Sequence, residues 1–80
     1  MPTIKTVSGA RIALHTDDHR PAHVHVIHEK KQIRLQISDA EPMDPIGSFH
    51  PRVLRDVQEW LRLNRDIVVE EWAKYHGKDD

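Results

Sequence analysis

The feature that most constrains the fold is a strict alternation of apolar and polar residues in the first half of the chain. It is clearest over residues 33–37, where isoleucine, leucine and isoleucine are separated by Arg34 and Gln36. A period of two places the apolar side chains on one face of a β-strand and the polar side chains on the other. The alternation also fixes the register, because a slip of one residue would bury the polar set.

Segments of this kind predict four antiparallel strands, at about residues 2–7, 10–16, 23–28 and 32–38. Ser8 and Gly9 stand between the first two as a two-residue turn, in which glycine readily takes a positive φ. These two strands are therefore expected to form a β-hairpin. Because sequential strands usually lie side by side, a meander is the expected strand order.

The second half of the chain carries the period of an α-helix instead. Residues 51–63 place an apolar stripe along one side, and Pro51 suits the first helical position, where its missing N–H would have no partner anyway. A second helix is expected over residues 66–76, with Asp66 as its cap. Its expected inner residues are Val68, Val69, Trp72 and Ala73. The predicted fold class is α+β: one domain, residues 1–80, with a four-stranded antiparallel sheet packed on two C-terminal helices.

The two faces of the predicted sheet differ in chemistry. The apolar face supplies the expected core, covered by two tryptophans: Ile12, Leu14, Val24, Val26, Ile33, Leu35, Ile37, Trp60 and Trp72. Antiparallel sheets often leave their second face open to solvent. That second face, called here the His/Arg face, consists of Arg11, His15, His23, His25, Arg34 and Gln36. We expect the function of the chain to reside there.

Composition narrows the classes of partner. The chain has no cysteine, which excludes disulfides and thiolate metal sites, and its net charge of −1 argues against indiscriminate nucleic-acid binding. No segment approaches the roughly 18 apolar residues of a membrane span, so a cytoplasmic protein without membrane association is expected. A chain of 80 residues buries a modest core, and a homodimer is therefore a candidate source of further stability.

Three of the seven histidines, His19, His23 and His25, lie within seven residues. His23 and His25 are two residues apart on a predicted strand, so their side chains leave the same face about 6.5–7 Å apart along the chain. One interpretation is a site for zinc or another transition metal, with these three histidines as ligands. No further ligand stands at one of the spacings common in metal sites.

Two other interpretations of the histidines stay open. In the first, His23 and His25 are the acid and base of a ribonuclease-like phosphodiester cleavage. The phosphate would then be held by Arg11, Arg20 and Arg34. In the second, the histidines are structural: they form a rigid corner and a polar sheet surface that meets a protein partner.

Several of these segments together resemble one known family. They are Met1-Pro2-Thr3-Ile4, Arg11-Ile12-Ala13-Leu14, Asp18-His19-Arg20-Pro21-Ala22-His23-Val24-His25-Val26, and Asn64-Arg65 followed by Glu71-Trp72. In this order, over nearly the whole chain, they resemble the family catalogued as domain of unknown function 4160. The Asp-His-x-Pro-x-His-x-His core is the most specific part of the likeness. Position 22, often a second proline in that family, is Ala22 in this chain.

The resemblance implies a small prokaryotic protein encoded beside another small protein, in a toxin–antitoxin-like pair. We therefore expect a small protein partner encoded nearby and, if the chain is the toxin, action on RNA through the His/Arg face. The alternative is a metal-binding or protein-binding adaptor, a regulatory module without catalysis. The sequence leaves open whether the chain is an enzyme, and no cofactor is expected outside the metal interpretation.

Overall fold

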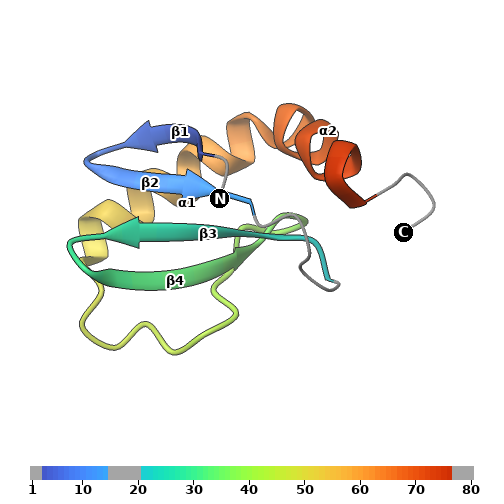
Figure 1. Cartoon of the computed structure of the whole chain (residues 1–80). Coiled ribbons are helices and arrows are strands. Elements are labelled where there is room, and N and C mark those ends of the chain that lie inside the picture. Colours follow the sequence, from blue (N-terminus) through green and yellow to red (C-terminus); the bar gives the residue numbers. More distant parts are fainter. Residues whose placement is uncertain (1–2, 15–20, 77–80) are drawn as a thin grey trace.

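The computed structural model describes residues 3–14 and 21–76 as a four-stranded sheet followed by two helices (Figure 1). The elements are β1 (Thr3–Val7), β2 (Ala10–Ala13), β3 (His23–His28), β4 (Lys31–Gln36), α1 (Pro51–Leu63) and α2 (Arg65–His76). All three strand pairs are antiparallel, in the order β1-β2-β3-β4. The α+β class and the meander are thereby confirmed.

Three element ends differ from those expected. β2 ends at Ala13, and the last two residues of the predicted strand, 15 and 16, lie outside the described residues. β4 ends at Gln36 because residues 37–39 form a turn. α2 begins at Arg65, since the carbonyl of Asn64 accepts the Val68 N–H, and the expected cap Asp66 therefore lies inside the first turn.

The β1–β2 and β3–β4 hairpins each close with two residues of positive φ. In the β1–β2 turn, Ser8 has a φ of 51° and Gly9 a φ of 82°. In the β3–β4 turn, Glu29 and Lys30 have φ values of 48° and 68°, without a glycine. Such turns match the right-handed twist of the strands, but they strain a residue that has a Cβ. The first turn is also held to α1, because the Ser8 hydroxyl donates to Asp56 at 2.6 Å.

The core lies between the sheet and the helices, and Figure 1 shows α1 behind the β1–β2 hairpin. Every strand residue expected in the core is buried, Trp72 is buried and Trp60 packs against the cluster partly exposed. α1 adds Val53, Leu54, Val57 and Leu61. The expected inner stripe of α2 is wrong at Val69, which is 48% exposed. The apolar residues of α2 lie on more than one side of the helix, and only the Val68–Trp72 side packs against the core.

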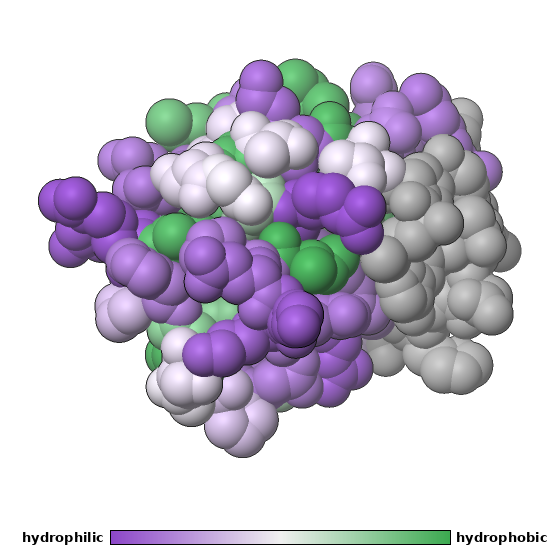
Figure 2. Space-filling view, turned by 60° about the vertical axis from the view of Figure 1, so that its left-hand side comes forward, coloured by the Kyte–Doolittle hydropathy of each residue, from purple (hydrophilic) through white to green (hydrophobic). Residues whose placement is uncertain are grey.

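The outer edge of β4 is covered by the loop that leads to α1. The Gln36 N–H donates to the Glu41 carbonyl at 2.9 Å, and the Met43 N–H donates to the Arg34 carbonyl at 2.8 Å. An uncovered edge strand would invite pairing with another chain, so these bonds protect it. On the face shown in Figure 2, hydrophilic residues predominate and the hydrophobic ones form small separate patches. Within the described residues, no helix has the length and apolarity needed to cross a bilayer.

Candidate functional site

The two strand histidines of the His/Arg face are buried. His23 is 4% exposed and His25 is 6% exposed, and Ala13 beside them on β2 is fully buried. The expectation of a solvent-open face is therefore wrong at this end of the sheet. His23 and His25 lie two residues apart, and their imidazoles leave the same face of β3, as expected. That face is covered at the two histidines.

The rings of His23 and His25 lie close together, with centroids 5.1 Å apart. Nδ1 of His23 lies 2.7 Å from the Pro21 carbonyl oxygen, and because a carbonyl can only accept, this nitrogen donates. Nδ1 of His25 accepts from the Gln32 side-chain amide at 2.8 Å. The ring of His23 also meets the indole of Trp72 on α2, with centroids 5.7 Å apart. One nitrogen of each ring is thus used to hold neighbouring protein segments.

Arg34, an expected phosphate contact, is held by an aspartate of the loop after β4. Its Nε and Nη2 donate to both oxygens of Asp44, with a shortest distance of 2.7 Å, and its backbone N–H donates to the same carboxylate at 3.1 Å. These bonds to Arg34 lower the pKa of Asp44 below its usual value, against a smaller opposing effect of burial. The negative charge of Asp44 therefore offsets the positive charge of Arg34 that would attract a phosphate.

Arg11, a further residue of the proposed chemistry, is not paired with either histidine across the sheet. Arg11 lies exposed on β2 opposite Ile27, whereas His25 lies opposite Ala13 and Arg34. His15, His19 and Arg20 lie outside the described residues, so the three-histidine metal site stays a prediction. Among residues 3–14 and 21–76, no three or more His, Cys, Asp or Glu side chains are grouped so as to hold a metal ion.

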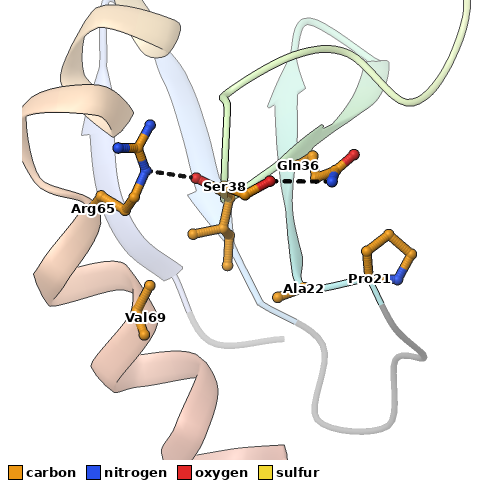
Figure 3. Close-up of a pocket in the computed structure, with 7 residues that line it drawn as sticks. Pro21, Ala22, Gln36, Ser38, Arg65 and Val69 are labelled. Carbon is orange, nitrogen blue, oxygen red and sulfur yellow. Dashed lines mark hydrogen bonds between the residues drawn. The ribbon is translucent and has the colours of Figure 1, made fainter. Parts of the chain in front are cut away.

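A pocket of about 420 Å³ lies where the entry to β3, the end of β4 and the start of α2 meet (Figure 3). Four apolar residues line it: Pro21, Ala22, Ile37 and Val69. The described lining also includes three polar residues: Gln36, Ser38 and Arg65. Figure 3 shows Arg65 and Val69 on α2, facing the strand ends. The backbone bond from the Ile37 N–H to the Ala22 carbonyl, 3.0 Å long, joins the two strand ends there.

Arg65 is the polar centre of this pocket. Its Nε donates to the Ile37 carbonyl at 3.0 Å, which fixes the guanidinium against the end of β4. Nη1 and Nη2 form no hydrogen bond or ion pair with any residue of the described part of the chain. Sequence reasoning missed this site, because it assigned Val69 to the core and no binding role to Arg65. The one available signal was the presence of aliphatic residues on several sides of α2.

Comparison with known proteins gives one family. Residues 9–73 match the model of the family described as "Domain of unknown function (DUF4160)", which covers most of the chain. The match confirms the resemblance drawn from the sequence. Neither the curated proteins nor the solved structures contain a significant match to this chain.

Proposed function

This chain belongs to the DUF4160 family, and we propose that it acts without catalysis as the protein-binding component of a two-protein pair. The observation that carries this proposal is the pocket beside α2, which combines aliphatic walls with an arginine whose terminal nitrogens are unbonded within the described structure. Arginine is enriched at protein interfaces, where its planar fork binds acidic groups. The proposed occupant is a segment of a small protein encoded next to this chain, the partner expected from the family resemblance.

The burial of the two histidines and the ion pair of Arg34 on the His/Arg face support a role without catalysis. A general base must reach the proton it removes, directly or through one water molecule. His23 and His25 are almost fully buried, and each has one ring nitrogen bonded to the protein. Arg34, which would bind phosphate, is bound to Asp44. These side chains stabilise the sheet and its neighbouring loop, and the partner surface is assigned to α2.

The proposal is tested by purifying this chain with the protein encoded beside it and measuring the mass of the complex by size exclusion with light scattering. We expect a stable complex that is weakened at least tenfold by Val69→Glu. The matched control is Ile46→Glu, since Ile46 is also a half-exposed aliphatic residue but lies in the loop after β4, outside the pocket lining. The proposal fails if the two proteins stay separate at tens of micromolar, or if both variants behave alike.

A second assay examines catalysis directly. The purified chain is incubated with a mixed-sequence RNA, beside a His25→Ala variant whose fold has been checked by circular dichroism. We expect no cleavage by either protein. Cleavage by the parent chain that disappears in the folded variant would establish the acid–base interpretation and overturn the role without catalysis.

A further inference from the structure

We propose that the pocket beside α2 takes the C-terminal residue of the partner protein, binding its terminal carboxylate at Arg65 and its aliphatic side chain on the apolar walls. This assignment rests on the proposed function and specifies which part of the partner enters the site. Three properties of the described residues support it: the hydrogen bonding of Arg65, the charge of the described lining, and the apolar walls together with the pocket volume.

The guanidinium of Arg65 is positioned to receive a carboxylate. Its bond from Nε to the Ile37 carbonyl holds the group in place, and within residues 3–14 and 21–76 both terminal nitrogens keep their protons available. A guanidinium is always charged at physiological pH, and its parallel N–H groups match the two oxygens of a carboxylate. Because the group is already held, little side-chain freedom is lost when a ligand binds.

The other polar residues of the described lining, Gln36 and Ser38, add hydrogen-bond donors and carry no negative charge. The Ser38 hydroxyl accepts from the Gln36 side-chain amide at 3.1 Å and keeps its own proton to donate. Among the described residues that line the pocket, none is an aspartate or a glutamate. Arg65 is thus the only charged residue of the described lining, and an anion is the complementary ligand.

The apolar walls favour a chain end over an isolated anion as the ligand of the pocket. Pro21, Ala22, Ile37 and Val69 make up most of the lining, which a phosphate or sulfate would leave unfilled. The volume of about 420 Å³ is at the lower end of the range of ligand sites, roughly 300–1,000 Å³. A C-terminal aliphatic residue presents a carboxylate and an apolar group from a single Cα.

The test uses N-acetylleucine as a mimic of such a chain end, titrated into the 15N-labelled full chain and followed by NMR. Two relatives serve as comparisons: N-acetylleucinamide, which has no carboxylate, and N-acetylglutamate α-amide, whose carboxylate is on the side chain. We expect N-acetylleucine to shift the signals of Ser38 and Val69 saturably, with a Kd on the order of millimolar for so small a ligand. Both relatives should bind at least tenfold more weakly.

Arg65→Gln should weaken the binding of N-acetylleucine about tenfold, while Arg55→Gln, on the exposed side of α1, should leave it unchanged. If the Arg65 variant does not fold, the amide comparison still tests the carboxylate on the parent chain. The assignment is overturned if the amide binds equally well, if the glutamate compound binds as tightly, or if N-acetylleucine causes no shifts. Failure of the proposed function is a separate result, because the complex with the neighbouring protein is measured without these ligands.

Discussion

The ion pair between Arg34 and Asp44 leads to a specific prediction about acid stability. The two side chains are partly exposed, at 40% and 32%, which reduces the free energy that the charges contribute. The geometry is favourable, however, because the carboxylate accepts from two side-chain nitrogens and from a backbone N–H of the edge strand β4. We expect Asp44→Asn to lower the free energy of unfolding at pH 7 by about 1–1.5 kcal/mol.

The effect of pH follows from the direction of the pKa shift. The pKa of Asp44 is lower in the folded chain than the 3.8 expected when it is unfolded, chiefly because of its side-chain hydrogen bonds with Arg34. A carboxyl group of this kind binds fewer protons in the folded state, so it stabilises the fold at pH values above 3.8. That contribution is lost as the pH falls through the folded-state pKa. The gap in unfolding free energy between the parent chain and the Asn variant should therefore be constant from about pH 7 to 5 and narrow as the pH falls below 3.8.

The measurement is urea unfolding at a series of pH values, followed by tryptophan fluorescence and circular dichroism. Glu59→Gln is the control, because Glu59 is an exposed carboxylate on α1 and has no hydrogen-bond partner within the described residues. Its stability should stay within about 0.5 kcal/mol of the parent at every pH. A gap for Asp44→Asn that does not narrow as the pH falls below 3.8, or that the control reproduces, would refute the assignment of this stability to the ion pair.

Three further predictions concern stability and use the same unfolding assay at pH 7. Lys30→Gly should stabilise the chain by about 1 kcal/mol, because Lys30 has a φ of 68° that glycine takes without strain; a loss of stability would contradict this. His25→Ala should lower the free energy of unfolding by about 2–3 kcal/mol, since the buried ring and its bond from Gln32 are both lost. His50→Ala, at the exposed start of α1, should lower it by about 1 kcal/mol or less. Leu35→Ala should cost about 2–5 kcal/mol, because the side chain is fully buried in the core; a smaller loss would mean that the core closes around the cavity.

The sheet and its core could be predicted because their signal is local. The alternation in β4 states which side chains share a face, and the buried Ile33 and Leu35 follow from it without knowledge of the rest of the chain. The turn at Ser8 and Gly9 is local in the same sense. The same parity placed His23 and His25 together, so the composition of the second face was also predicted there.

The sequence of the strand does not indicate which residues cover its second face. Burial of His23 depends partly on Trp72, which lies 49 positions later in the sequence and reaches it only through the packing of α2. The partner of Arg34 is Asp44, in an irregular loop where no periodic pattern indicates direction. Val69 was misplaced for a related reason: α2 has aliphatic residues on several sides, so its sequence cannot show which side packs.

The entry to β3, residues 21–23, is in contact with both the pocket beside α2 and α2 itself. Pro21 and Ala22, from the Asp-His-x-Pro-x-His-x-His segment, form one wall of the pocket. The next residue, His23, contacts Trp72 of α2, the helix that forms the opposite wall. The Ala22 carbonyl accepts from Ile37, whose own carbonyl holds Arg65. Pro21, Ala22 and His23 thus join the start of β3 to α2 and to the end of β4, a structural role that shapes the pocket proposed above as the binding site.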